Sequence, residues 1–533
     1  MPDASPPIDD NETTTFKRNA RFWLVFVALC SCTLLSALDL GGIGTAAPTI
    51  VNDLNGSDFT WVASVYSLSS SSTILLSGHL AEIFGRSIII MTGIIVFAVG
   101  STISGSAQSL PVFIGGRAVQ GVGSGAIQAL NSIIITDLVP LRERGLYAGI
   151  TGLVWTIGTV TGPFIAGSLA QDKTWRWFFY LNLPHCGIAF IIVMSFLRLK
   201  RPEGDVRQKL TKIDWLGNTA IIGSTCSCML ALTFGGIRFP WTSASVLVPL
   251  VLGLFGLLAT LFYESRWPEY PVIPWVILSN RTSLSGYLAT FIQGVVTLGI
   301  VFYLPTWFQS VKAASPILSG LYILPLAVAV PLASIAQGYF VSKTGCYRRV
   351  NLFGWCSVLL GTGLLISLKL DTSIGLVVLY QLVTGVGLGF LYSTTFPILA
   401  PLPLKQNASA VAFMTFLRQC SQAWGVSIGG TILQNSLTSR LPNMPFIDVK
   451  SHEGGQLAYS IIPQIPKLPA DLKLPVQTAY LQSLRQLWVA FTIFGALGMA
   501  TVFMMKSYPL KRVLDAKWGI EGEAHDDLAM TES

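Results

Sequence analysis

Charged residues are scarce in this chain. Only 11% of its 533 residues are Asp, Glu, Lys or Arg, whereas 52% are hydrophobic. A soluble domain has about 25% charged residues, so the composition excludes an ordinary soluble protein. The sequence has only four histidines, and it contains no Ser/His/Asp set, zinc-ligand spacing or Walker loop. We therefore expect no enzyme active site, no metal, no cofactor and no ATPase domain.

The hydrophobic residues are concentrated in long segments. A helix needs about twenty apolar residues to cross a bilayer, and the segments are too long and too evenly apolar for barrel strands. The sequence therefore predicts an all-α polytopic membrane protein that lies in a lipid bilayer. We expect fourteen spans, at 22–46, 59–81, 87–105, 109–137, 145–169, 177–197, 214–236, 244–263, 283–308, 317–340, 350–368, 374–399, 408–432 and 486–507.

Basic residues alternate between the two sides of these spans. With the N-terminus placed in the cytoplasm, 22 Lys and Arg residues fall on the inner side and five fall in the short outer loops. This asymmetry follows the positive-inside rule, and it predicts that both termini are cytoplasmic. The same distribution explains the net charge of +8, so we expect no nucleic-acid partner.

The chain contains an internal repeat. The segment from Arg117 to Gly125 matches the segment from Gln381 to Gly389, and the loop that ends at Arg86 matches the loop that ends at Arg349. Two related six-helix halves are implied, as in many transporters, and the seventh and eighth spans have no counterpart. We expect this order of parts: a disordered cytoplasmic tail at 1–20, a first half at 21–197, a connector with two extra helices at 198–265, a second half at 266–510 with a long extracellular loop at 433–485, and a cytoplasmic tail at 511–533.

Four groups of residues resemble the motifs of one known family. The residues that carry the resemblance are Leu38, Asp39 and Pro48 in the first span, Gly78, Leu80, Ala81, Gly85 and Arg86 in the following loop, Arg117, Gln120, Gly121 and Gly123 in the fourth span, and Gly149, Gly158, Gly162, Pro163 and Gly167 in the fifth. On these residues the chain is similar to the major facilitator superfamily, in its fourteen-span drug:proton antiporter branch of fungal type. It departs from the family's loop motif at Glu82, which replaces an aspartate, and at Ile83 and Ser87, and Ala166 replaces a motif glycine in the fifth span.

The resemblance implies a major facilitator fold of two pseudo-symmetric six-helix halves plus two linker helices. It also implies a monomeric secondary transporter that exports a small organic molecule, such as a secondary metabolite, an organic acid or a drug, in exchange for protons. One alternative is uptake or vacuolar transport of an iron chelate or a basic amino acid. Another is a receptor or scaffold that does not transport. We expect the plasma membrane, with the vacuolar membrane as the alternative.

Asp39 is the only carboxylate deep inside a predicted span. An intramembrane acid costs about 2.5–3.5 kcal/mol on insertion scales and usually marks a functional site. Arg117 lies at a similar depth, because each residue is about seven or eight positions from the outer end of its span. We expect Asp39 and Arg117 to take part in proton coupling; the alternative is a permanent structural ion pair.

Other polar residues within the spans are candidates for contact with the cargo. Arg418 is the second intramembrane cation, and two buried cations against one acid suit an anionic or zwitterionic cargo. The alternative for each residue is a structural hydrogen bond within the bundle. The candidate residues are Gln120, Gln128, Asn131, Gln381 and Arg418.

Two motifs are expected to act in conformational change. Gly149, Gly158, Gly162 and Gly167 remove side-chain bulk from the fifth span, and Pro163 removes a backbone donor. We expect this span to form a hinge face between the halves, with Gly162 more sensitive to a larger residue than Gly149. The loop from Gly78 through Glu82 and Gly85 to Arg86 is expected to form a cytoplasmic latch; positive-inside anchoring and generic packing are the alternatives.

Overall fold

The regular structure of this chain is helical throughout its described part. The computed structural model describes residues 19–54, 59–171, 174–197, 199, 202, 205–236, 239–441 and 461–510. Helices satisfy all backbone hydrogen bonds within one segment, which a lipid environment requires. The expected tails at 1–18 and 511–533 lie outside the described residues.

The helices fall into three groups along the chain. The first group is α1 (Ala20–Asp53), α2 (Phe59–Phe84), α3 (Arg86–Ser106), α4 (Leu110–Leu138), η1 (Leu141–Glu143), α5 (Arg144–Gln171), α6 (Arg176–Tyr180) and α7 (Asn182–Phe196). The linker group is α8 (Val206–Thr211), α9 (Trp215–Phe234) and α10 (Ala244–Glu264). The last group is α11 (Val276–Ser279), α12 (Arg281–Val311), α13 (Pro316–Tyr322), α14 (Leu324–Thr344), α15 (Tyr347–Ile366), α16 (Ile374–Phe390), α17 (Thr395–Leu399), η2 (Leu404–Gln406), α18 (Asn407–Arg440), η3 (Ile462–Lys467) and α20 (Ala470–Met504).

Twelve helical segments of the described chain are long and apolar enough to cross a membrane. The two expected spans outside this set are α2 and α18, which carry the serine run 69–72 and Arg418 respectively. These two helices pack against each other inside the bundle, where they face protein more than lipid and can carry polar side chains. The count of fourteen spans is compatible with this structure and stays a prediction.

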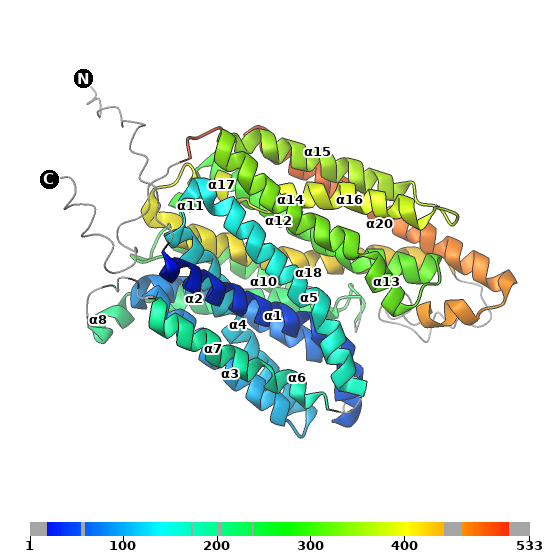
Figure 1. Cartoon of the computed structure of the whole chain (residues 1–533), viewed down its shortest axis with the longest axis horizontal. Coiled ribbons are helices and arrows are strands. Elements are labelled where there is room, and N and C mark those ends of the chain that lie inside the picture. The colour runs from blue at the N-terminus through cyan, green and yellow to red at the C-terminus, as the bar shows by residue number, and fades with distance from the viewer. Residues whose placement is uncertain are drawn as a thin grey trace.

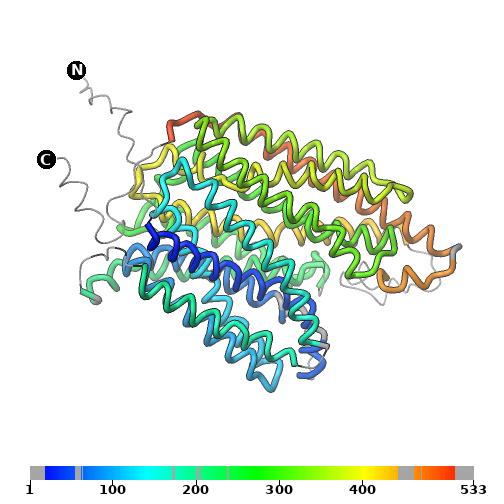
Figure 2. The backbone as a smooth tube through the Cα atoms, in the orientation of Figure 1, coloured from blue at the N-terminus to red at the C-terminus, as the bar shows by residue number. Residues whose placement is uncertain are grey.

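The two halves repeat one packing pattern. In the first half α4 packs against α2 and α3, and α1 packs against α5 and α7. In the second half α16 packs against α14 and α15, and α12 packs against α18 and α20. Figure 1 shows the halves side by side, and Figure 2 shows the chain running back and forth along one direction. The internal repeat of the sequence is thus also a repeat in space.

Two glycines mark the same turn in each half. Gly85 joins α2 to α3 with φ 101°, and Gly345 joins α14 to α15 with φ 68°. Each glycine donates its backbone N–H to the carbonyl four residues earlier, Ala81 in one turn and Val341 in the other. Positive φ costs glycine little because it has no Cβ. The two glycines share a positive φ and this hydrogen bond, but ψ is 147° at Gly85 and −1° at Gly345. The loop repeat read from the sequence is therefore a repeat of position and not of one backbone conformation.

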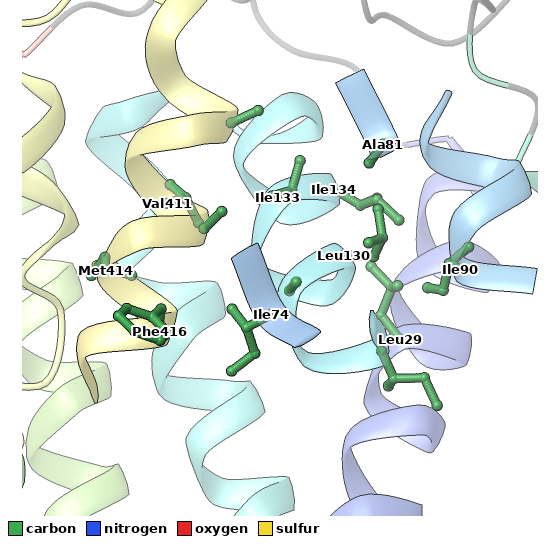
Figure 3. Close-up of a cluster of buried hydrophobic side chains, with 14 of the residues drawn as sticks. Leu29, Ile74, Ala81, Ile90, Leu130, Ile133, Ile134, Val411, Met414 and Phe416 are labelled. Carbon is green, nitrogen blue, oxygen red and sulfur yellow. The ribbon is translucent and has the colours of Figure 1, made fainter. Parts of the chain in front are cut away.

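The halves meet at one end of the bundle. We call this the basic end, because Arg86, Arg142, Lys343 and Arg348 lie in its turns; the positive-inside rule assigns it to the cytoplasm. One cluster of buried apolar side chains, here the shared inner cluster, joins both halves there. Figure 3 shows Ile133 of α4 on the side of Val411 of α18, and Ile134 on the side of Ala81 of α2. The first half has a separate cluster toward the opposite end, and the second half has one that extends along its length to Met505. The shared inner cluster therefore closes the basic end.

Two helices extend into the segment 433–485 that the sequence predicts as a long extracellular loop. Residues 433–440 and 470–485 are helical in α18 and α20, and the extracellular position of the segment stays a prediction. Helices of 34 and 35 residues, at about 1.5 Å per residue, are longer than the thickness of a hydrocarbon core, which is about 30 Å. Their ends therefore extend out of the lipid, and polar residues are tolerated in the helix there. The connector 198–213 also contains a short helix, α8.

Candidate functional site

The first candidate pair forms a buried ion pair. Arg117 Nη1 on α4 lies 2.5 Å from Asp39 Oδ2 on α1, and both side chains are fully buried. The sequence placed the two residues at similar depth but left open whether they face each other. Packing of α1 and α4 within one half brings them together, and removal of either partner would leave an uncompensated buried charge.

Gln120 completes a hydrogen-bonded triangle with this pair. It lies one turn after Arg117 on α4; its Oε1 accepts from Arg117 Nη1 at 2.7 Å, and its Nε2 donates to Asp39 Oδ1 at 2.9 Å. The glutamine thus bonds both charges at once and fixes their relative position. We call Asp39, Arg117 and Gln120 the charged triad.

Three further side chains surround the charged triad. Ser101 on α3 accepts from Gln120 Nε2 and from Asn182 Nδ2 on α7, both at 2.8 Å. The Arg117 guanidinium lies 4.5 Å from the ring centroid of Tyr66 on α2, a cation–π distance. Five helices of the first half therefore converge on one site. Two of the Arg117 nitrogens, Nε and Nη2, have no hydrogen-bond partner, so the cation retains donors for another group.

Gln128 and Asn131 lie on α4 closer to the basic end. Gln128 Nε2 donates to Ser70 at 3.2 Å and to Ser124 at 3.1 Å, and Ser124 accepts from the Tyr66 hydroxyl at 2.7 Å. Asn131 Nδ2 donates to the Leu29 carbonyl at 3.3 Å and to Thr33. Gln128 is connected through Ser124 to Tyr66 beside the charged triad, whereas Asn131 binds α1 separately.

The second half carries no charge at the matching place. Gln381 on α16, which aligns with Arg117, is buried and donates to the Tyr322 carbonyl at 2.9 Å. Arg418 lies elsewhere, on α18; its Nη2 donates to the Tyr392 carbonyl at 2.7 Å and its guanidinium lies 4.6 Å from the Tyr392 ring centroid. Among the described residues no carboxylate forms an ion pair with Arg418. The candidate residues thus fall into an N-terminal set and a separate C-terminal set.

The expected latch residues lie at the basic end, but they make two kinds of contact. Arg86 Nε bonds Asp137 Oδ2 at 3.1 Å and Arg86 Nη1 bonds the Ala81 carbonyl at 3.0 Å, both within the first half. Glu82 Oε1 instead accepts from Ser409 Oγ of α18 at 2.6 Å, which joins the halves. Arg142 also joins them, through the carbonyls of Ser342 and Lys343.

The expectation for the glycines of α5 needs correction. A Cβ on Gly162 would lie 2.7 Å from the Leu38 carbonyl oxygen, and one on Gly158 would lie 2.6 Å from the Ala37 Cβ, so both pack α5 against α1 within the first half. Gly149 is the glycine at the boundary, because its Cβ would lie 2.7 Å from the Ile335 backbone nitrogen on α14. Gly162 therefore does not lie between the halves in this structure, and which of the two glycines is more sensitive to a larger residue stays a prediction.

The comparisons with known proteins agree with this architecture. The sequence profile of the Major Facilitator Superfamily matches residues 29–429. The chain belongs to the major facilitator superfamily. It is 36% identical to the efflux pump FUS6 of Gibberella moniliformis over 542 residues, which covers 100% of this chain and 96% of the relative. It is 36% identical to the MFS-type efflux pump LUC4 of a Fusarium species, with 97% and 93% covered.

Solved structures show the same fold at low sequence identity. The proton:xylose symporter XylE gives a TM-score of 0.58 at 13% identity and covers 93% of this chain and 99% of its own. The human organic anion transporter MFSD10 gives 0.54 at 12% identity, with 90% and 98% covered. These likenesses establish the fold of this family member and say nothing about its cargo.

Sequence reasoning missed the hydroxyl-bearing members of the site. Ser101, Tyr66 and Ser124 are common residue types in helices, so nothing in the one-dimensional pattern distinguishes them from other serines and tyrosines. Asn182 offered a weak signal, because an asparagine within the sixth apolar segment must find hydrogen-bond partners. The described residues hold no group of three or more metal-ligating side chains.

Proposed function

We propose that this major facilitator protein exports a small organic molecule in exchange for protons. The charged triad carries the proposal: a fully buried carboxylate that changes its protonation would break and remake its contact with Arg117. The curated relatives, which are named efflux pumps, support the direction of transport. A metabolite-cluster transporter of Aspergillus aculeatus, 34% identical to this chain, supports a secondary metabolite as cargo.

Alternating access would connect the proton to the cargo. Closure of the basic end by the shared inner cluster corresponds to a conformation that faces the opposite side. Protonation of Asp39 from that side would release Arg117, whose two spare donors could then bind elsewhere in the half. The rearranged half would favour opening at the basic end, where the cargo binds and the proton leaves.

The surroundings of Arg418 support the hypothesis that the cargo carries an acidic group. Its guanidinium has a carbonyl and a ring as neighbours, and a Cβ on Gly152 of α5 would lie 3.5 Å from the same Tyr392 ring. The cation therefore lies next to the boundary between the halves without a recorded carboxylate partner. A carboxylate of the cargo would form bidentate hydrogen bonds with it.

We further propose that the protein acts in the plasma membrane as a monomer.

The proposal is tested in two steps. First, culture medium of the source organism with and without the gene is profiled, and the compound that needs the gene for its release is the cargo. Second, that compound is followed in liposomes that contain the purified protein, under a pH gradient of either sign. We expect movement of cargo against the proton gradient and its loss with a protonophore; movement in the same direction as protons would establish uptake instead.

A further inference from the structure

A pair of carboxylates lies in the linker helices, far from the charged triad in sequence. Asp214 is the N-cap residue of α9, and Glu264 is the last residue of α10. These two helices pack against each other, and α9 also packs against α2 and α18. Both acids lie at the basic end, where α9 begins and α10 ends.

Each carboxylate is held by one of its oxygens. Asp214 Oδ1 accepts from the Gly217 backbone N–H at 2.8 Å and from the Tyr263 hydroxyl at 3.4 Å. Glu264 Oε2 accepts from the backbone N–H groups of Val272 at 2.8 Å and Ile273 at 3.5 Å. The bonds orient both side chains and leave one oxygen of each carboxylate free.

The two free oxygens face the same point. A Cβ added to Gly217 would lie 2.3 Å from Glu264 Oε1 and 2.4 Å from Asp214 Oδ2, so both oxygens border the space that this glycine leaves open. Neither oxygen has a hydrogen-bond partner, and each is inaccessible to solvent. The Glu264 side chain as a whole is buried, with an exposed fraction of 3%.

Two ionised carboxylates beside one buried space repel each other, because like charges disfavour the second ionisation. A proton or a cation between them would remove this repulsion. Divalent cations take about six or more oxygen ligands, and the described residues hold no cluster of three metal-ligating side chains. The geometry therefore favours a proton.

We propose that Asp214 and Glu264 share one proton and form a second protonation site, in the linker helices. The proton is bonded to one oxygen and donated to the other, so the pair carries one negative charge. The site is independent of the proposed proton antiport, and it would make the packing of α9 against α10 respond to pH at the basic end.

Other titratable groups surround the pair. His79 on α2 bonds the Lys212 backbone, interacts electrostatically with Asp214 and Glu82, and has no partner at Nε2. Glu82 in turn accepts from Ser409 across the halves. The remaining groups are Tyr263 beside Asp214, Lys212 before α9, and Cys420 of α18, which lies near Cys228 further along α9. The protonation site is thus linked through His79 to a helix that joins the two halves.

Infrared spectroscopy tests the shared proton directly. Full-length protein in liposomes is measured near neutral pH in sodium-free buffer, and the C=O stretch of a protonated carboxylic acid is compared between variants. Wild type should show this band. Glu264→Gln and Asp214→Asn should each lack the part of its intensity that one protonated carboxyl group contributes. Both changes preserve shape and the anchoring oxygen, and Asn remains a good N-cap. Glu269→Gln, an exposed acid in the neighbouring loop, should leave the band unchanged.

Titration provides the second measurement. In wild type the band should disappear as pH rises, and the apparent melting temperature should fall over the same interval, because the folded state binds the shared proton. In Glu264→Gln both dependences should be absent. A wild-type spectrum identical to that of Glu264→Gln would overturn the proposal, as would stabilisation of wild type alone by added sodium or potassium ions without the acid band.

Discussion

The two halves of this transporter share a fold but differ in chemistry. Helices α2, α3 and α4 pack as α14, α15 and α16 do, and a glycine with positive φ, Gly85 or Gly345, stands at the corresponding turn of each half. At the matching depth, however, the first half holds Arg117 and Gln120 and the second holds Gln381 and Thr384. The repeated packing requires only small residues and satisfied hydrogen bonds. The two halves can therefore share a fold although only the first half has a charged residue at this matched depth.

The comparison shows that the charged triad and the contacts that join the halves lie in different places. The charged triad lies within the first half, where five helices hold it, and it makes no recorded contact with the described residues of the second half. The halves are joined by the shared inner cluster, by the packing of α5 against α14 and by the hydrogen bonds of Glu82 and Arg142. The proposed proton site lies inside one half, so a change in its protonation would act on the shape of that half and only through it on the boundary.

The largest expected effect concerns the stability of the two matched positions. Arg117→Leu leaves Asp39 buried without its partner, which costs about 3–5 kcal/mol when a buried ion pair is broken. Gln381→Leu removes one hydrogen bond, which costs about 0.5–1.5 kcal/mol. The measurement is the apparent free energy of unfolding of each variant in the same detergent. Equal losses would contradict the claim that only the first half depends on charge.

The next effect distinguishes the two glycines of α5. Leucine at either Gly149 or Gly162 overpacks its site at a cost of about 1–3 kcal/mol. Only Gly149 faces the other half, so only Gly149→Leu should shift the protein toward an open basic end. A cysteine at Ile133, in a chain without its native cysteines, would report opening through its rate of labelling by a thiol reagent. Faster labelling with Gly162→Leu than with Gly149→Leu would show that the boundary is assigned to the wrong glycine.

A smaller effect is expected at the hydrogen bond between the halves. Ser409→Ala removes the bond to Glu82, a loss of about 1 kcal/mol, and should raise the same labelling rate modestly. Ser87→Ala is the matched control, because the Ser87 hydroxyl bonds the Leu197 carbonyl at 2.7 Å within the first half. A double-mutant cycle with Glu82→Gln isolates the pair. Additive effects of the two changes would mean that Glu82 and Ser409 are not coupled.

The sequence predicted the fold far better than the contacts. Apolar length gave the helices, and the depth of Asp39 and Arg117 within their spans was sufficient to pair them as candidates. Which side of a helix faces which neighbour is decided by packing in three dimensions, so Gly149 and Gly162 could not be ranked from their spacing. Ser101 and Asn182 join the site only because α3 and α7 pack beside α4 and α1. Polar residues after 432 and before 486 end the apolar spans, but they do not end the helices, so the sequence could not predict that α18 and α20 extend into the segment 433–485.

The proton-carrying role of Asp39 is tested most directly by comparing two kinds of transport in one preparation. Wild type, Asp39→Asn and the control Gln381→Leu are placed in liposomes with the exported compound. Exchange of labelled for unlabelled cargo is then measured without a pH gradient, and accumulation is measured with one. Exchange requires movement of the halves but no net proton transfer, whereas accumulation requires both. We expect Asp39→Asn to retain exchange and lose accumulation, and Gln381→Leu to retain both. Full accumulation by Asp39→Asn would contradict the account.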